Sequence, residues 1–175
     1  WGADAIKIEI PAERDGGQGL GGARHGPDFL NLHRNKRGMT INLKQPEGLE
    51  IFMALAKDAD VIVENFRAAV KHRLGVDYES VRAINPGIIY GSISGFGQTG
   101  PISKRAGVDQ IAQGMGGLMS ITGLPGQGPV RVGIPIADLT AGMYLAQGIL
   151  LAMIERSRSG LGQWVHTSLL EAQLS

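Results

Sequence analysis

Short apolar strand patterns alternate with amphipathic helical patterns along the first half of the chain, and this alternation restricts the fold more than any other feature. Strand patterns are predicted at residues 5–10, 39–43, 60–64 and 87–94. Helical patterns are predicted between them, at residues 46–59, 68–73 and 78–84. Parallel strands need such crossovers, whereas antiparallel strands can be joined by tight turns. We therefore expect an α/β fold with an open, largely parallel sheet and flanking helices.

One long apolar pattern dominates the second half of the chain. Residues 140–158 predict a helix that is apolar on most faces, and such a helix is expected to be buried. A shorter helix is predicted at residues 108–118, and a last strand at residues 164–167. Gln147 and Gly148 interrupt the longest apolar run, which therefore falls short of the roughly 18 residues that a membrane helix needs. We expect no membrane partner.

The composition is that of an ordinary soluble domain. The chain has 175 residues, of which 43% are hydrophobic and 19% charged, enough for one domain with a real core. A net charge of +1 gives no sign of nucleic-acid binding. The absence of cysteine excludes disulfides, thiolate metal sites and cysteine nucleophiles, and it favours a reducing compartment. We expect a cytoplasmic protein, and a mitochondrial location stays open.

Both ends of the chain interrupt a structural pattern. The sequence starts without Met directly before a strand pattern, and it stops at LLEAQLS inside an apolar helical pattern. We therefore interpret the sequence as a piece of a longer polypeptide whose native N-terminus is not present.

The glycines at residues 95–100 (GFGQTG) match the GxGxxG pattern and follow a predicted strand. A dinucleotide site also needs an apolar helix after the glycines and an acidic residue about 20 residues later, and neither occurs here. A glycine turn at the carboxyl end of a parallel strand is still an element of a ligand-binding crevice.

Basic residues gather at the predicted strand ends and in the loops beside them. They are Lys36, Arg37, Lys44, Arg67, Arg73, Lys104 and Arg105. One interpretation is solvated surface charge, and the other is a site for an anionic ligand, especially one that carries phosphates. The four histidines have no metal-ligand spacing and no serine nucleophile motif occurs, so no metal is expected.

Asp138 lies in the apolar segment GIPIADLTAG, just before the long helical pattern. An ionised carboxylate in such surroundings needs compensation. It can be the N-cap of the helix, the partner of a basic group, or a nucleophile toward an activated acyl group. The residue pattern alone leaves these three alternatives open.

Six characteristic segments follow one another along the chain. They are GADAIKIEIP, NKRGMTINLKQPEG, ADVIVENF with RLGVDYE, NPGIIYGSISGFGQTGP, IPIADLTAG and RSRSGLGQWVHTSLLEA. Together they resemble the class III coenzyme A transferases of the formyl-CoA transferase type, a family that also includes the 2-methylacyl-CoA racemases. The resemblance covers the chain apart from the loop at residues 14–29.

This resemblance implies a domain organisation. Residues 1–175 would form part of a large, Rossmann-like domain that binds CoA and carries the catalytic residue. The family's opening strand, its smaller distal domain and a second glycine-rich loop would lie outside this chain. The resemblance further implies an interlocked homodimer.

The resemblance also implies that Asp138 is the nucleophile of a CoA-transferase. Its carboxylate would attack an acyl-CoA thioester to give an aspartyl anhydride, and the CoA thiolate would return to form an aspartyl-CoA thioester. An acceptor carboxylic acid would then take over the CoA, which serves as substrate and acyl carrier. The family's CoA contacts correspond to Ile41, Asn42, Leu43, Lys44, Asn65, Phe66, Arg67, Arg73 and Arg105.

Two positions depart from the family pattern of CoA contacts. Many members carry Asp where this chain has Asn42, and some place an Arg near the nucleotide where it has Ile10. The run PVRVGIPIADLTAG is closer to transferases that act on dicarboxylic acids than to the carnitine or oxalate branches. Arg131 in this run could pair with a distal carboxylate or lie at the surface.

Two alternatives stand beside the transferase. A racemase needs two acid/base groups on opposite faces of the α-carbon, and the family's racemases supply one from a His directly before an Asp. Val108 occupies that position before Asp109 here, and valine cannot carry a proton. The other alternative is an inactive CoA-binding paralogue, against which the intact Asp138 argues.

Overall fold

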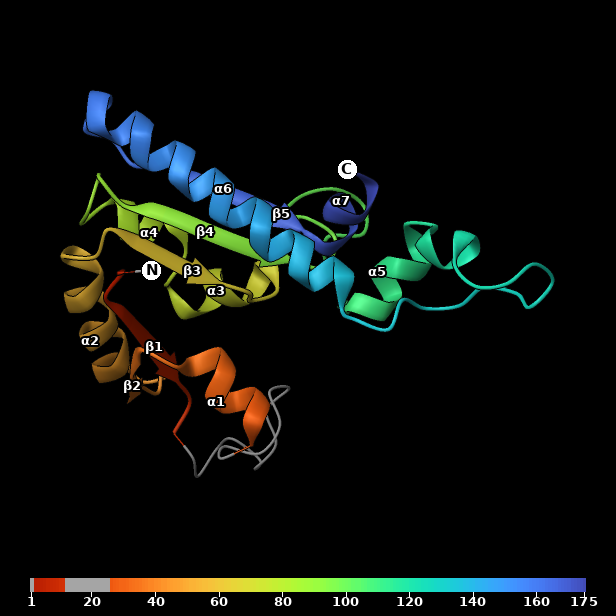
Figure 1. Ribbon diagram of the computed structural model, residues 1–175. Coiled ribbons are helices and arrows are strands. Elements are labelled where there is room, and N and C mark those ends of the chain that lie inside the picture. Colours follow the sequence, from red (N-terminus) through yellow and green to blue (C-terminus); the bar gives the residue numbers. More distant parts are fainter. Residues whose placement is uncertain (1, 12–25) are drawn as a thin grey trace. The chain divides into compact units, whose positions relative to one another are not determined.

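The structure of the chain is a computed structural model that describes residues 2–11 and 26–175. It divides into two compact units, Trp1–Ala54 and Leu55–Ser175. Each unit contains parallel strands and flanking helices (Figure 1), which confirms the predicted fold class. The strands of the described chain belong to two sheets, one in each unit. Most of the loop expected before residue 27 lies outside the described residues.

A two-stranded parallel sheet forms the centre of the first unit. β1 (Ala5–Glu9) pairs with β2 (Lys36–Thr40), and the two strands run in register along their whole length. α1 (Pro27–His33) precedes β2, and the apolar pattern did not predict it. Asn35 joins the two with φ of 59°, a left-handed conformation that Asn tolerates better than most residues. α2 (Pro46–Lys57) follows with Pro at its first turn, where the missing N–H costs little.

The second unit is built on a three-stranded parallel sheet in the order β3–β4–β5. The strands are β3 (Val61–Glu64), β4 (Ile89–Ser94) and β5 (Trp164–Ser168). All three lie within a residue or two of their predicted positions. β4 is the central strand, and its first residues are fully buried, as expected of a parallel strand covered on both faces.

Helices connect the strands of the second unit, as parallel pairing requires. α3 (Ala68–Leu74) and α4 (Tyr78–Arg82) lie between β3 and β4. α5 (Asp109–Met115), a 3₁₀ turn (Leu118–Ile121) and α6 (Ile136–Ser159) lie between β4 and β5. α7 (Leu169–Leu174) follows β5 directly.

Successive residues of β4 point to opposite faces of the sheet, which separates two packing layers. Gly91 faces α6, where a β-carbon would lie 3.1 Å from the Cδ1 of Ile149. Tyr90 points the other way, and its hydroxyl donates a hydrogen bond to the carbonyl of Val76 at 2.6 Å. Its ring meets that of Tyr78 edge to face at 6.1 Å. α6 therefore packs on one face of the sheet and the segment from α3 to α4 on the other.

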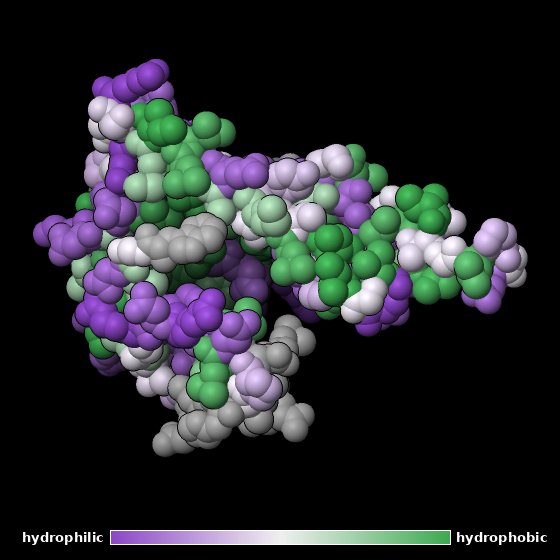
Figure 2. Space-filling view, viewed as in Figure 1, coloured by the Kyte–Doolittle hydropathy of each residue, from purple (hydrophilic) through white to green (hydrophobic). Residues whose placement is uncertain are grey.

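The long helix α6 is buried on one side only, so the prediction that it is buried rather than surface-lying is wrong for its outer side. Ala137, Ala141, Leu145 and Ala152 are buried, whereas Leu151 keeps 67% of its surface exposed. Figure 2 shows apolar side chains over its C-terminal half. By length and composition alone α6 could cross a membrane, which the interrupted apolar run had not predicted. Its buried side packs on β4 and β5.

Arg156 ties the C-terminal end of α6 to the start of the sheet. Its guanidinium donates hydrogen bonds to the carbonyl oxygens of Asp60 and Gly87, at 3.2 and 3.1 Å. It also pairs with the Asp60 carboxylate at 2.9 Å. Asp60 directly precedes β3 and Gly87 lies two residues before β4, so this end of the helix is anchored beside the start of both strands.

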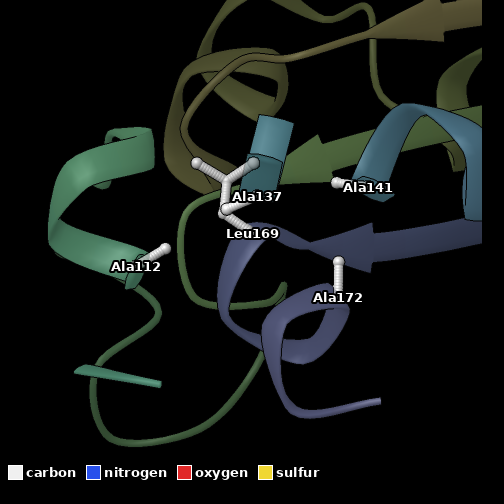
Figure 3. Close-up of a cluster of buried hydrophobic side chains, with 5 residues drawn as sticks. All are labelled: Ala112, Ala137, Ala141, Leu169 and Ala172. Carbon is white, nitrogen blue, oxygen red and sulfur yellow. The ribbon is translucent and has the colours of Figure 1, made fainter. Parts of the chain in front are cut away.

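Small side chains fill the place where the N-terminal end of α6 meets α5 and α7. The buried cluster consists of Ala112, Ala137, Ala141, Leu169 and Ala172 (Figure 3). Alanine lets helix backbones approach closely, because it places a single methyl group between them. This close contact defines the surroundings of Asp138.

Candidate functional site

Asp138 occupies the first turn of α6 and its side chain is exposed. Partial burial of the carboxyl group and the negative charge of Asp109 raise the pKa of Asp138 above its ordinary value of 3.8. The helix begins two residues earlier, so Asp138 is not its N-cap and the cap interpretation is wrong. No described side chain donates a hydrogen bond to its carboxylate or forms an ion pair with it. The role of Asp138 as a nucleophile stays a prediction.

Asp109 is buried beside Asp138, at the start of α5. One carboxylate oxygen, Oδ1, accepts hydrogen bonds from the backbone N–H of Ala137 at 2.8 Å and of Asp138 at 3.4 Å. The other oxygen, Oδ2, accepts one from the Nε2 of Gln113 at 2.6 Å. The sequence had drawn attention to Asp109 as the residue after Val108, at the position where the family's racemases place a His before an Asp. Burial of an acidic residue depends on partners far along the chain, so no local pattern could have revealed this role.

Two glycines bring the start of α5 to the carboxyl end of β4. A β-carbon on Gly95 would overlap the backbone of Gly107, and one on Gly107 would overlap that of Gly95. The carbonyl of Gly95 also accepts a hydrogen bond from the backbone N–H of Leu170 at 3.2 Å. The glycine loop after β4 thus serves close backbone packing beside the strand end, and it places Asp109 two residues beyond Gly107.

The loop after β3 carries three of the predicted CoA contacts, Asn65, Phe66 and Arg67. Asn65 and Arg67 are exposed and Phe66 is half-buried. The Glu64 carboxylate accepts a hydrogen bond from the backbone N–H of Phe66 at 2.7 Å, which fixes the turn of this loop. Arg73 lies at the end of α3 and is exposed, as is Arg105.

Three predicted cations of the second unit have no ion-pair partner in the part of the chain that the structure describes. Arg67, Arg73 and Arg105 form no ion pair with any residue that the structure describes. Exposed guanidinium groups without a carboxylate partner are available to phosphate groups of a ligand. This observation favours the anionic-ligand interpretation for these three residues.

A buried lysine lies beneath the loop after β3, and the sequence patterns did not reveal it. Lys71 is completely buried in α3, and its Nζ donates hydrogen bonds to Glu64 at 2.9 Å, Ser92 at 3.1 Å and Gln98 at 2.7 Å. The Nζ also lies 4.7 Å from the centre of the Trp164 ring, a cation–π contact. The network joins the loop after β3 to the glycine loop after β4.

The remaining predicted CoA contacts, Ile41 to Lys44, belong to the first unit. Ile41 is buried, and its N–H donates a hydrogen bond to the carbonyl of Glu9 at 2.9 Å. The Asn42 side chain accepts a hydrogen bond from the N–H of Lys44 at 3.2 Å, so the residue that departs from the family pattern shapes this turn. A β-carbon on Gly48 would overlap the Asn42 carbonyl, which places the first turn of α2 directly against the segment.

The first unit also contains a cavity of about 380 Å³ that includes none of the predicted contacts. It is lined by Lys7, Glu9, Phe29, Leu30, His33, Arg34, Lys36, Arg37 and Gly38. Within the described ranges, no group of three or more metal-ligating side chains comes together.

Known proteins resemble this chain along its whole length. The sequence model of CoA-transferase family III matches residues 1–175. A succinate–glutarate CoA-transferase of Agrobacterium fabrum is 42% identical over 98% of this chain and 45% of its own length. The human succinyl-CoA:glutarate CoA-transferase is 39% identical over 99% of this chain and 40% of its own length.

A solved structure supports the same relationship. The crystal structure of a CAIB/BAIF family protein from Brucella suis matches with a TM-score of 0.90 and 40% sequence identity, over 99% of this chain and 47% of that one. The chain thus spans less than half the length of the relatives it matches. With the family model matched from end to end, the chain belongs to CoA-transferase family III.

Proposed function

We propose that the protein carrying this chain transfers coenzyme A from an acyl-CoA thioester to a carboxylic acid, with Asp138 as the nucleophile. The main support is the Asp138 carboxylate, which is exposed in the first turn of a long helix without a partner among the described residues. A carboxylate suits this reaction because an anhydride keeps the acyl group activated, whereas an ordinary ester would not.

The reaction proceeds by four acyl transfers. A carboxylate oxygen of Asp138 attacks the thioester carbonyl, the C–S bond breaks, and CoA leaves as the thiolate with the bonding electron pair. The thiolate then attacks the Asp138 carbonyl of the mixed anhydride and releases the donor acid. The acceptor carboxylate attacks the resulting aspartyl-CoA thioester and expels the thiolate again. Attack of this thiolate on the acceptor carbonyl yields the new acyl-CoA and regenerates Asp138.

Coenzyme A binding is proposed for two groups of residues. In the second unit, Arg67, Arg73 and Arg105 would bind the phosphates, and Asn65 and Phe66 would contact the nucleotide. This is supported by the arginines' lack of an ion-pair partner among the described residues. In the first unit, Ile41, Asn42, Leu43 and Lys44 would contribute backbone amides and one ammonium group. The cofactor is a substrate here, and its strongest anchor is its phosphate charge.

A dicarboxylic acid is the proposed acceptor class. The two curated relatives described above act, by their names, on succinyl and glutarate groups. Arg131 is exposed before α6 and has no ion-pair partner among the described residues. A guanidinium there would suit the distal carboxylate of such an acid.

The racemase alternative is disfavoured by Val108. It forms the N-cap position of α5, directly before Asp109, and it offers no group that exchanges a proton. An inactive CoA-binding paralogue would not need a carboxylate at residue 138. We further propose an interlocked homodimer in the cytoplasm; the exposed apolar face of α6 supports a larger assembly, because such surface is normally covered.

Trapping of the covalent intermediate tests the proposal. The natural-length protein is incubated with succinyl-CoA and hydroxylamine, and the modified residue is located by mass spectrometry. We expect a hydroxamate on Asp138 and none on Asp138→Asn. A parallel reaction with a chiral 2-methylacyl-CoA in deuterated water, without an acceptor acid, should show no α-exchange. Rapid exchange without a hydroxamate would instead establish the racemase.

A further inference from the structure

The N-terminus of α6 is capped from another part of the chain. Its own N-cap residue is Pro135, which forms no side-chain cap. The first backbone N–H groups of a helix have no partner inside the helix and need one outside it. Asp109 supplies this partner across 28 residues of sequence, because its Oδ1 accepts from the N–H groups of Ala137 and Asp138. These are the second and third residues of α6, the donors that an ordinary N-cap side chain would serve.

A second buried residue holds Asp109 in place. Gln113 is fully buried one turn along α5, and its Nε2 donates to the Asp109 carboxylate at 2.6 Å. The same amide donates to the carbonyl of Ile134 at 3.3 Å and accepts from the N–H of Val132 at 2.8 Å. Gln113 therefore fixes both Asp109 and the segment that leads into α6. The cap cannot move without breaking buried hydrogen bonds.

We propose that Asp109 is the positioning residue of Asp138: its carboxylate, delivered from the start of α5, caps α6 through the amide of the nucleophile itself and places a negative charge beside the nucleophile. This inference rests on the proposed function of Asp138. The backbone position of Asp138 then depends on Asp109 directly. The neighbouring charge has a second effect, because it favours the anhydride and the thioester, in which Asp138 carries no charge, over the free carboxylate.

Asp109 is the charged neighbour of Asp138 among the described residues. The elements that pack on α6 contribute Glu171 from α7 and His166 from β5 besides Asp109 from α5, whereas Tyr90 of β4 points to the opposite face of the sheet. Of all these groups, only Asp109 raises the pKa of Asp138, in addition to the effect of burial. Removal of the Asp109 charge should therefore lower this pKa.

Two variants of the natural-length enzyme separate the cap from the charge. Asp109→Asn keeps the oxygen that accepts from the two N–H groups and removes the charge. We expect the acidic limb of the pH profile of kcat to move to lower pH, while KM for succinyl-CoA stays nearly unchanged. In Asp109→Ala the cap is lost too, and we expect kcat to fall by about 10²-fold, the loss that a misplacement of about 1 Å can cause. Asn places its amide nitrogen against that of Gln113, so the double variant D109N/Q113M, which removes the opposing donor without adding a charge, is used if Asp109→Asn folds poorly.

Asp77→Asn provides the matched control. Asp77 is as deeply buried as Asp109, 7% against 8% exposed, and caps α4 through Ser80. A general loss of stability would affect both variants, whereas only Asp109→Asn should move the acidic limb. An unmoved limb in both Asp109→Asn and D109N/Q113M, with a hydroxamate still formed on Asp138 in the wild type, would overturn the inference. Absence of the hydroxamate in the wild type would instead overturn the proposed function.

Discussion

Replacement of Lys71 by Met tests whether the buried network under the loop after β3 holds the second unit together. The Lys71 side chain is 0% exposed and its partner Glu64 is 6% exposed. Met has a similar length but no donor, so Lys71→Met leaves the Glu64 carboxylate buried without its cation and Gln98 without its donor. Removal of one member of a buried ion pair costs about 3–5 kcal/mol.

The loss should appear as a lower urea midpoint in equilibrium unfolding of the natural-length protein. For a denaturant slope of about 2 kcal/mol/M, a loss of 3–5 kcal/mol lowers the midpoint by about 1.5–2.5 M. The amide of Phe66, which donates to Glu64, should also exchange faster with deuterium, because its acceptor is no longer held.

The double variant Glu64→Gln/Lys71→Met separates an unpaired charge from a general packing defect. It removes both charges, and the Gln oxygen can still accept from the Phe66 N–H. Neutral replacement of a buried pair often costs little, so the double variant should regain most of the lost stability. The reasoning is refuted if Lys71→Met unfolds within about 0.5 M of the wild type, or if the double variant is less stable than Lys71→Met.

Three further predictions concern the site and its surroundings. Asp138→Asn should abolish turnover and raise the thermal midpoint at pH 7. The pKa of Asp138 in the folded state is raised above 3.8, so its stabilising contribution is full below pH 3.8 and is lost as the pH rises through the raised pKa. An unchanged or lower midpoint would contradict this. Arg73→Gln and Arg105→Gln should weaken the binding of CoA, measured by calorimetry. If the replaced arginine faces the 3′-phosphate, CoA binding should weaken more than dephospho-CoA binding. Equal affinities of wild type and variants would show that these arginines are solvated surface residues without a role in binding. Asp77→Ala should cost about 1 kcal/mol at pH 7 through loss of the α4 cap. Burial opposes ionisation of Asp77, yet hydrogen bonds from Ser80 hold its pKa below 3.8, so the cost should disappear as the pH falls through that lowered pKa, which unfolding at several pH values would measure.

Strands with an apolar pattern could be predicted from the sequence, and strands without one could not. β3, β4 and β5 lie close to their predicted positions because a parallel strand buried on both faces leaves a continuous apolar run. β2 begins at Lys36, and both Lys36 and Arg37 are exposed, so the strand starts inside a charged run. Because the first residues of β2 are charged and exposed, the apolar pattern of the sequence indicated a strand that starts later, at residue 39.

The residues of the candidate site also fall into those that the sequence predicted and those that it did not. Asp138 and the predicted cations were identified because they stand out locally or match a family motif. Lys71 and Asp109 were not, since their roles come from partners at Ser92, Gln98 and Ala137, far along the chain. The burial of the long helix α6 was predicted wrongly for a related reason. An apolar pattern indicates which residues could be buried, but the packing of α5, α7 and the sheet determines which side of the helix is buried.

The single helix α6 connects the two ends of the second unit's sheet. Arg156 fastens one end to the start of the strands, while Asp138 stands at the other, about five turns or about 27 Å away. A rigid-body rotation of α6 by about 2° at the Arg156 end would displace Asp138 by about 1 Å. We therefore expect that loss of a hydrogen bond at Arg156, remote from the proposed nucleophile, would displace Asp138 by a distance that can slow the proposed acyl transfer.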